Sequence, residues 1–445
     1  CVINVECLTF LFYRHQLGAR TTHSEAHIVI VGIPREMKPG EDRVAMTPAN
    51  IQAWSKKGVE FIVESNAGEA AGFSDELYKD AGASISAERS EIFAKADIIA
   101  QVQSFGANEI NGDDDLAHLK PGQLIAGMMD PLGSPATAEK LAKTGATAIA
   151  MELVPRISRA QSMDVLSSMA TLAGYKAVLL GAGLAPRIMP MLMTAAGTLN
   201  PMRTFIMGVG VAGLQACATA KRLGGVVEAY DVRPAARDQI ISVGAKPIEL
   251  DLETDSSEDK GGYAKEQGED FIRRQQELMT AVLAEQDLVI TTAAIPGAKS
   301  PILVTADMVK AMKPGAVIVD LAAERGGNCE LTQLGETVVA HGVTIIGPDN
   351  LAATIPHHGS QMFGKNIETL LEHLLDEENK LQLDFEDEIV FETVVAHGGD
   401  VPHKRMRELL GYPAVDLKEN ADLGESIDLD ADDDTATEQK EGGAS

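Results

Sequence analysis

The sequence predicts an α/β protein with two separate, mostly parallel β-sheets. Short apolar runs alternate with helical patterns along most of its 445 residues. The alternation falls into two series, and the residues between them are rich in Met, Ala and Leu. Strands that alternate with helices form βαβ units, whose strands lie parallel in one sheet. Two such series therefore indicate two sheets.

The first series runs from residue 28 to residue 150. Its apolar runs are short and nearly continuous, as is typical of strands buried on both faces of a parallel sheet. Its helices are expected over residues 48–57 and 75–81. Its strands are expected over residues 28–33, 60–64, 97–103, 124–128 and 146–150.

The second series begins near residue 203 and repeats the same pattern. A helix is expected up to residue 222, after the first strand of this series. The strands are expected over residues 204–207, 226–230, 287–291, 316–320 and 343–346. The residues between the two series, 157–199, are expected to be mostly helical.

The apolar stretch 177–199 has the length of a membrane span. Arg187 lies near its middle, which costs about 2.5–3.5 kcal/mol on insertion into a bilayer. Pro186 and Pro190 also interrupt the stretch. We therefore expect a buried helix or a domain connection here.

Later segments depart from the alternation. Residues 253–270 are polar and have no apolar period, which is typical of a lid or a disordered tip. Residues 362–375 form an amphipathic helical pattern, and residues 388–395 are strand-like. Residues 411–445 contain 11 acidic residues against Lys418 and Lys440, a net charge of −9. We expect this acidic tail to be disordered.

The charge and the cysteines restrict the partners and the compartment. The chain has 38 Lys and Arg against 66 Asp and Glu, a net charge of −28. Such a chain repels phosphate backbones and anionic lipid, so we expect no nucleic-acid partner and no direct docking on a membrane. Cys1, Cys7, Cys217 and Cys329 are widely spaced, which favours a reduced, cytosolic protein. Cys217 and Cys329 are expected to be buried thiols.

The strongest local motif is Gly208-Val-Gly210-Val-Ala-Gly213, which follows a predicted strand and opens a predicted helix. In a dinucleotide site the first glycine permits a tight turn and the second lets the backbone approach the pyrophosphate. The third lets the helix pack on the sheet. The positive end of the helix then faces the phosphates. The alternative is a plain glycine turn.

Asp231 ends the next predicted strand, 18 residues after Gly213, where a carboxylate can bind the ribose hydroxyls of an adenosine. This position favours NAD(H), because a carboxylate repels a 2′-phosphate. Arg233 complicates the prediction, since a nearby arginine can accept that phosphate. The alternatives for Arg233 are a surface residue and a side chain that stacks on the adenine.

A second group of polar residues lies just before the second series and comprises Arg156, Gln161, Asp164 and Ser167. The spacing of the last three places them on one helical face or turn. This is where a cleft between two α/β domains is expected, so the group is a candidate site. An N-cap followed by a solvated helix face is an equally good interpretation.

Several motifs together resemble the NAD(H)-binding alpha subunit, or soluble domain I, of proton-translocating NAD(P) transhydrogenase, a family related to alanine dehydrogenase. The resemblance covers about residues 28–410. The segments that carry it are 34–48, 156–167, 208–213, 231–233, 294–299 and 320–327.

This resemblance implies two Rossmann-like domains with a cofactor cleft between them. The N-terminal α/β domain would comprise residues 27–165 and 355–410, completed by a helix that returns near the C-terminus. Residues 166–354 would form the domain that binds NAD(H). Residues 1–26 would be an N-terminal extension of doubtful status, and residues 411–445 the acidic tail.

The resemblance also implies residue roles. Arg156 and Gln161 would hold the carboxamide and ribose region of the nicotinamide nucleotide, and Asp164 and Ser167 would hold the loop. Tyr263 would belong to a mobile loop that closes over the nucleotide. Gly208, Gly210, Gly213, Asp231, Val232 and Arg233 would complete the NAD(H) site.

Hydride would pass directly from NADH to NADP⁺. NADP(H) would bind only to a partner, the beta subunit, and a membrane domain would couple the transfer to proton movement. A homodimer is expected. The chain would lie on the cytoplasmic face of the inner membrane through its partners, without inserting into the membrane itself.

Two other functions compete with this one. An alanine dehydrogenase needs an Arg, a Lys, a His and an Asp; here Arg43 matches the Arg, but Gln103 stands at the Lys position, residues 127–130 lack the His, and Glu324 replaces the Asp. A non-catalytic NAD-binding sensor is the third possibility. His357 and His358 have no accompanying ligand spacing, so a loop or interface pair is expected there and no metal site.

Overall fold

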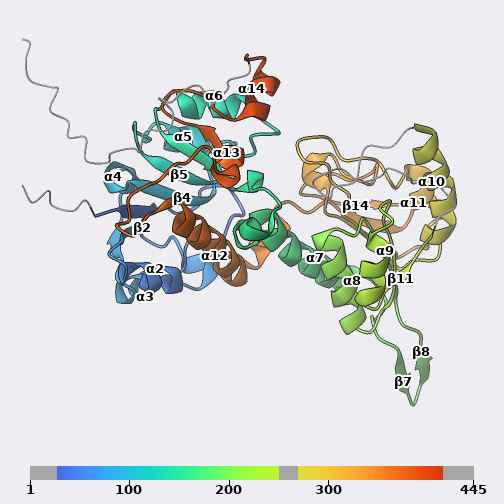
Figure 1. Cartoon of the computed structure of the whole chain (residues 1–445). Helices are drawn as coiled ribbons and strands as arrows, with labels where there is room; N and C mark the ends of the chain where they lie inside the picture. Colours follow the sequence, from blue (N-terminus) through green and yellow to red (C-terminus); the bar gives the residue numbers. More distant parts are fainter. Residues whose placement is uncertain (1–27, 250–268, 414–445) are drawn as a thin grey trace, which may run out of the picture. The chain divides into compact units, whose positions relative to one another are not determined.

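The computed structural model describes residues 28–249 and 269–413. Within these ranges the strands form two seven-stranded sheets and one two-stranded hairpin (Figure 1). Nearly all neighbouring strands in the large sheets are parallel. The predicted α/β class with two parallel-dominated sheets is therefore confirmed.

The first sheet has the strand order β16-β6-β5-β4-β1-β2-β3. Its strands are β1 (Ile30–Ile33), β2 (Glu60–Glu64), β3 (Ser84–Ser86), β4 (Ile98–Gln103), β5 (Leu124–Met128), β6 (Thr147–Ala150) and β16 (Val394–Ala396). Only β16 is antiparallel to its neighbour, and it pairs with β6 from far along the chain. The Oγ1 atom of Thr147 lies 2.8 Å from Nδ1 of His397 at this edge. A late segment therefore completes the first sheet.

Helices from both ends of the chain pack around this sheet. α4 (Arg89–Lys95), α6 (Ala136–Ala142) and α14 (Lys404–Leu410) contribute to one apolar cluster with its strands. α12 (Pro356–Leu374) packs against α2 (Pro48–Ser55) and buries an apolar stripe. That stripe comprises Phe363, Ile367, Leu370, Leu371 and Leu374. α12 confirms the predicted amphipathic helix and extends it by two turns towards the N-terminus.

The second sheet has the order β11-β10-β9-β12-β13-β15-β14. Its strands are β9 (Arg203–Met207), β10 (Val226–Tyr230), β11 (Lys246–Pro247), β12 (Leu288–Thr291), β13 (Val317–Asp320), β14 (Thr337–Ala340) and β15 (Val343–Ile346). Only β14 runs antiparallel. Residues Phe205 and Ile206 of β9 belong to different apolar clusters, because successive side chains point to opposite faces. Both faces are therefore buried.

Different helices cover the two faces of the second sheet. α7 (Val165–Leu184), α8 (Val211–Arg222) and α9 (Ala236–Ser242) pack on the face that includes Ile206. α10 (Glu269–Leu283) and α11 (Ala306–Ala311) pack on the face that includes Phe205. Cys217 and Cys329 are buried free thiols in these clusters, as predicted.

The prediction that residues 157–199 are mostly helical is correct only up to Leu184. A 3₁₀ helix, η4 (Ser158–Met163), and α7 come first, and a hairpin of β7 (Leu192–Thr194) and β8 (Gly197–Leu199) follows them. Ala185 adopts an extended backbone (φ −69°, ψ 138°) before Pro186. Proline disfavours a helical conformation in the residue before it, which explains the end of α7.

Among the described residues, α7 is the one helix long and apolar enough to cross a membrane. The core helices of many proteins also meet that criterion, so this is weak evidence for a span. α7 packs on α8 and buries Ala177, Val178 and Gly181. At Gly174 an added Cβ would lie only 2.1 Å from the carbonyl oxygen of Ala212 in α8.

Residues 388–395 form a helix followed by a strand, so the prediction of a strand there is wrong for its first six residues. α13 (Glu388–Thr393) begins at Asp387, whose carboxylate accepts a hydrogen bond from the amide of Ile389. This N-cap favours a helix over an extended strand. Only Val394 onwards is β16.

Other predicted segments lie outside the described residues. These are residues 1–26, most of the acidic tail and most of the polar segment 253–270, including Tyr263. Residues Glu269 and Asp270, at the end of that segment, begin α10.

Candidate functional site

The glycine-rich turn joins β9 to α8 at the carboxyl edge of the second sheet. Gly208 has a φ of +89°, which most side chains disfavour, and a Cβ on Gly213 would lie 2.0 Å from the carbonyl oxygen of Gly208. At Gly210 no described heavy atom lies within 4 Å of the position of an added Cβ. The first and third glycines are thus needed by the fold, whereas Gly210 leaves open space before the N-terminus of α8.

Asp231 follows β10 beside this turn. Its Oδ2 accepts the amide of Val209 at 2.7 Å, so the carboxylate is tied directly to the glycine-rich turn. Arg233 folds back on the same carboxylate, with Nε 2.9 Å from Oδ1 and Nη2 3.0 Å from Oδ2. Val232 packs against the apolar cluster of the second sheet. The structure therefore brings Asp231 and the glycine turn together and adds a guanidinium to them.

Three residues that were not among the predicted site residues hold the neighbouring loops. The hydroxyl of Thr292, after β12, donates to the carbonyl of Gly208 at 2.9 Å. The side-chain amide of Asn328 accepts from the amide of Ala293 and donates to its carbonyl, at 2.9 and 2.8 Å. Asp320, at the end of β13, is fully buried and accepts the amide of Asn328 at 2.7 Å. Asp320 had two signals in the sequence, its position at the end of an apolar run and its place in the segment 320–327 that carries the resemblance.

These bonds connect the loops that follow three adjacent strands, β9, β12 and β13. In open α/β sheets, ligands bind outside the carboxyl ends of the strands. These hydrogen bonds therefore hold the glycine-rich turn in a fixed position relative to the neighbouring loops. The carboxyl edge of the sheet is a preorganised surface rather than a set of independent loops.

The segment from Arg156 to Ser167 divides into two halves. The carboxylate of Asp164 accepts the amide of Ser167 at 2.9 Å and its hydroxyl at 2.6 Å, which makes Asp164 the N-cap of α7. The capping interpretation is thus correct for this pair. Gln161 lies on η4, and both Gln161 and Arg156 are exposed. A role of these four residues in binding stays a prediction.

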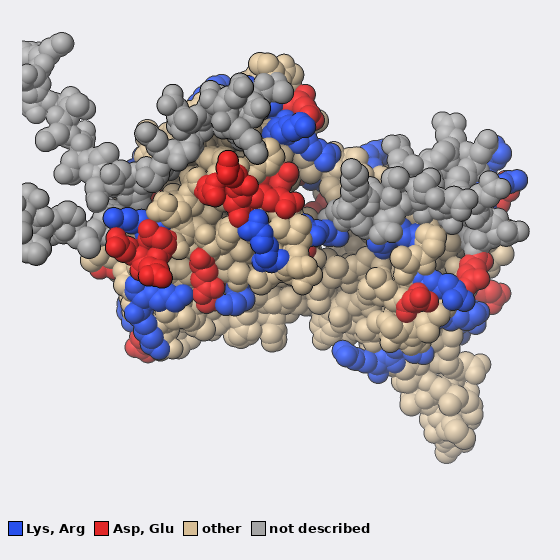
Figure 2. Space-filling view, in the orientation of Figure 1, with Lys and Arg blue, Asp and Glu red and all other residues tan. Residues whose placement is uncertain are grey.

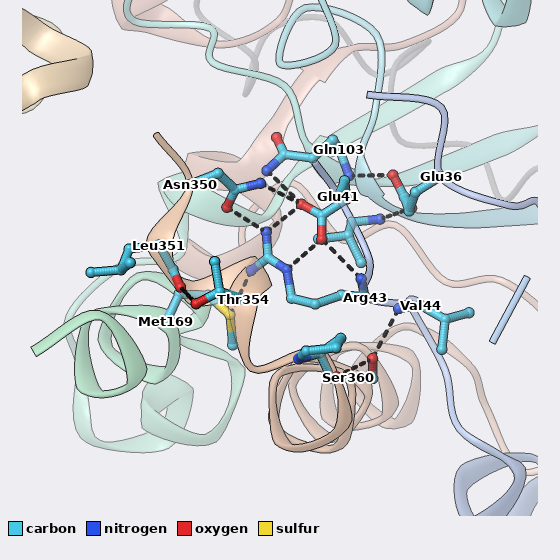
Figure 3. A network of polar contacts seen from close by, with 12 residues as sticks. Glu36, Glu41, Arg43, Val44, Gln103, Met169, Asn350, Leu351, Thr354 and Ser360 are labelled. Carbon is cyan, nitrogen blue, oxygen red and sulfur yellow. Dashed lines mark hydrogen bonds and ion pairs between the residues drawn. The ribbon is translucent and has the colours of Figure 1, made fainter. Parts of the chain in front are cut away.

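A second polar network surrounds Arg43 beside the first sheet (Figure 3). The Arg43 side chain is only 1% exposed and forms an ion pair with Glu41, with Nη2 2.5 Å from Oε2. It also donates to Oδ1 of Asn350 at 3.0 Å and contacts the sulfur of Met169. Gln103 donates to Glu41 at 3.2 Å. The arginine is therefore enclosed by protein groups.

The carboxylates of this network have different pKa values. Burial would raise the pKa of Glu41, but the hydrogen bonds and charge of Arg43 outweigh burial and hold it below the usual value. Burial, followed by the negative charge of Glu41, raises the pKa of Glu36 to about 8. The amides of Val102 and Gln103 oppose that increase by donating to Glu36 at 2.6 and 3.0 Å.

Glu152 supports the loop after β5. Its Oε1 accepts the amides of Met129 and Asp130 at 2.7 and 2.5 Å, whereas Oε2 is buried without a partner among the described residues. Burial raises the pKa of Glu152 to about 7. A proton on Oε2 is compatible with this geometry, because both amides use the other oxygen.

We expect Glu152→Gln to remove a portion of the pH dependence of stability. Because the pKa of Glu152 is about 7 in the folded protein and about 4.3 in an unfolded chain, the folded state binds more protons between these values. Its stability therefore falls as pH rises through that window. Relative to the native chain, the free energy of unfolding of Glu152→Gln should increase by up to about 3 kcal/mol from pH 4 to pH 8. Urea unfolding at several pH values measures this difference. If the unfolding free energies of the two proteins changed with pH in parallel, the raised pKa of Glu152 would be contradicted.

Comparison with known proteins agrees with this architecture. Residues 32–173 match the model for the N-terminal domain of the alanine dehydrogenase/PNT family, and residues 177–404 match the model for its C-terminal domain. The chain belongs to the alanine dehydrogenase/PNT family. The predicted resemblance is therefore confirmed.

Individual members of this family are similar over most of their length. In Rhodospirillum rubrum, the first section of NAD(P) transhydrogenase subunit alpha is 46% identical over 84% of this chain and 97% of its own. A transhydrogenase structure from Sinorhizobium meliloti matches with a TM-score of 0.74 and 42% identity, over 84% of this chain and 99% of its own. The alanine dehydrogenase of Bacillus subtilis is 30% identical over 74% of this chain and 81% of its own.

His357 and Glu324, two other residues considered in the sequence analysis, make ordinary structural contacts. Among the described residues no group of three His, Cys, Asp or Glu side chains could hold a metal ion. His357 instead lies in the first turn of α12, where Nδ1 is 2.8 Å from the carbonyl oxygen of Ala71. Its ring stacks on Phe73 at 4.7 Å. Glu324 accepts the amide of Asn350 at 3.0 Å.

Proposed function

We propose that this chain is the NAD(H)-binding alpha component of a proton-translocating NAD(P)⁺ transhydrogenase. The observation that carries the proposal is the open space at Gly210, beside the N-terminus of α8 and the carboxylate of Asp231. Five relatives named as transhydrogenase alpha subunits are 39–46% identical, against 29–30% for two alanine dehydrogenases. NADH would transfer hydride directly to NADP⁺ bound on a beta subunit, and a membrane domain would couple this to proton translocation.

The residues of the chain would position the nucleotide. Gly210 would let the pyrophosphate approach the positive end of α8, while Gly208 and Gly213 shape the turn. Asp231 would select the adenosine ribose of NAD(H). Arg156 and Gln161 would orient the nicotinamide, while Asp164 and Ser167 fix the start of α7. Tyr263 would close over the bound nucleotide.

NADH supplies the hydride, and the protein supplies proximity, orientation and exclusion of water. Hydride transfer between two nicotinamides releases no proton, so no general acid is needed at the nicotinamide. Membrane attachment would be peripheral, on the cytoplasmic face of the inner membrane, and would occur through the partner subunits.

An alanine dehydrogenase is less well supported by the geometry. A 2-oxo acid would need a free cationic group, but the Arg43 side chain is enclosed by Glu41, Asn350 and Met169. Gln103 cannot donate a proton as a lysine does.

The deciding experiment mixes the purified chain with an NADP(H)-binding partner domain and measures hydride transfer. Inertness in this mixture together with NAD⁺ reduction by L-alanine would overturn the proposal, and nucleotide binding without either activity would indicate a sensor.

The same mixture tests the orienting role of Gln161. We expect Gln161→Asn to slow hydride transfer by roughly tenfold or more, because a shortened side chain misplaces the nicotinamide. NADH affinity should change little. Full activity of the variant would contradict the role.

A homodimer would use the β7–β8 hairpin. No Lys, Arg, Asp or Glu occurs between Ile188 and Met202, and the hairpin is an uncharged protrusion in Figure 2. Met193 is 81% exposed, and Leu192 and Leu199 are also exposed. Apolar surface of this kind marks contact sites.

We expect Met193→Asp to shift the protein towards monomers, because association would bury the new carboxylate. Sedimentation across a concentration series measures the shift. Val339→Asp is the matched control, since Val339 is another exposed apolar residue, on edge strand β14. Equal behaviour of the two variants would show that the hairpin is not the interface.

A further inference from the structure

Asp231 makes more hydrogen bonds in this structure than a simple ribose acceptor would. Oδ1 accepts the amide of Arg233 at 2.8 Å and its Nε at 2.9 Å. Oδ2 accepts the amide of Val209 at 2.7 Å and Nη2 of Arg233 at 3.0 Å. A carboxylate offers about four lone-pair sites. All of them are used.

The pair is also sheltered from water. The exposed fractions of the side chains are 6% for Asp231 and 16% for Arg233. Nη2 of Arg233 additionally donates to the carbonyl oxygen of Val209 at 3.1 Å, within the glycine-rich turn. Two parallel, charge-assisted bonds in such a site hold the guanidinium firmly against the carboxylate.

An adenosine ribose and a 2′-phosphorylated ribose would meet this pair differently. A neutral hydroxyl can replace one N–H donor on Asp231 without leaving a charge unpaired. A 2′-phosphate would have to attract the guanidinium of Arg233 away from Asp231. The negative, largely buried carboxylate of Asp231 would then lie beside the phosphate without its cation. Removing one partner of such a pair is costly.

We propose that Asp231 excludes NADP(H) chiefly by holding Arg233, and that Arg233 is a latent binding group for the 2′-phosphate. This rests on the proposed function, in which the glycine turn binds a dinucleotide, and it names the residue that determines specificity. In the simpler alternative, Asp231 acts only by repelling the phosphate, and Arg233 has no role in the choice. The two accounts differ in whether the effect of Asp231 depends on Arg233.

The experiment measures the dissociation constants of NADH and NADPH, by fluorescence of the bound nucleotide, for four proteins. These are the native chain, Asp231→Asn, Arg233→Leu and the double variant. Asp231→Asn should tighten NADPH binding by roughly 10- to 100-fold, the effect of a released charge-assisted hydrogen bond. The double variant should lose that gain. Arg237→Leu is the control, because Arg237 forms an exposed pair with Glu249 nearby and both affinities should be unchanged.

If Asp231→Asn and the double variant gained the same affinity for NADPH, Asp231 would act only by repelling the 2′-phosphate. That result would overturn the proposal. Weaker NADPH binding in Arg233→Leu would also overturn it, because Arg233 would then already be available in the native chain. This second test does not require Asp231→Asn to fold. If the native chain bound neither nucleotide, the proposed function itself would fail, which separates the two outcomes.

Discussion

Replacing Gly210 with alanine is expected to leave folding intact and to weaken NADH binding severely. The backbone of Gly210 has φ −77° and ψ −160°, which alanine adopts without strain. No described atom lies within 4 Å of the new methyl group. A nucleotide pyrophosphate would need that space, so we expect Kd for NADH to rise by roughly 10- to 100-fold, or about 1.4–2.8 kcal/mol.

Gly213→Ala is the contrasting variant. Its methyl group would lie 2.0 Å from the carbonyl oxygen of Gly208, so the start of α8 must move. Overpacking of this kind costs about 1–3 kcal/mol of folding stability. Calorimetry and nucleotide titration should therefore separate the two glycines, with stability changed at Gly213 and affinity alone at Gly210. Unchanged NADH affinity in Gly210→Ala would remove the main support for the dinucleotide site.

The network around Arg43 should be worth more to stability than any exposed ion pair in the described residues. Arg43→Met keeps much of the apolar volume but leaves the buried carboxylate of Glu41 without its cation. Such a loss costs about 3–5 kcal/mol. The loss should shrink as pH falls, because a protonated Glu41 no longer needs a partner. Urea unfolding measures both effects.

The double variant Arg43→Met, Glu41→Gln should recover much of the stability, since neither charge then remains buried alone. Lys57→Met is the matched control. Lys57 pairs with Glu372 at 3.1 Å, but their side chains are 48% and 43% exposed. Exposed pairs contribute about 0–1 kcal/mol. Similar losses in Arg43→Met and Lys57→Met would contradict the importance of the network.

Strands are the most predictable elements of this fold. The predicted ranges 60–64, 124–128, 226–230 and 343–346 agree with β2, β5, β10 and β15 at both ends. Buried parallel strands are nearly continuous apolar runs, so their limits are visible in the sequence. The hairpin after Pro190 is not predictable in this way, because its strands are exposed. Its run of apolar residues has the same pattern in the sequence as a buried helix or a core segment.

Site residues are predictable where the backbone requires them. Gly208 and Gly213 are needed by the turn itself, and their spacing is visible in the sequence. The enclosure of Arg43 by Asn350 is not predictable, because 307 positions separate the two residues and only the fold brings them together. The pairing of Asp231 with Arg233 escapes prediction for another reason: which way a side chain turns depends on its surroundings.

The strand β16 has a consequence for the order in which the protein is made. It pairs with β6, which precedes it by about 250 positions: Val394 lies opposite Ile149, and Ala396 lies opposite Ala148. At about 5–20 residues per second, a ribosome needs roughly ten seconds to a minute to synthesise that interval. During this time the edge of β6 has no strand beside it, while every strand of the second sheet is being made. The sheet whose synthesis starts first is therefore the last to be completed, and its unpaired edge is open to wrong partners in the meantime.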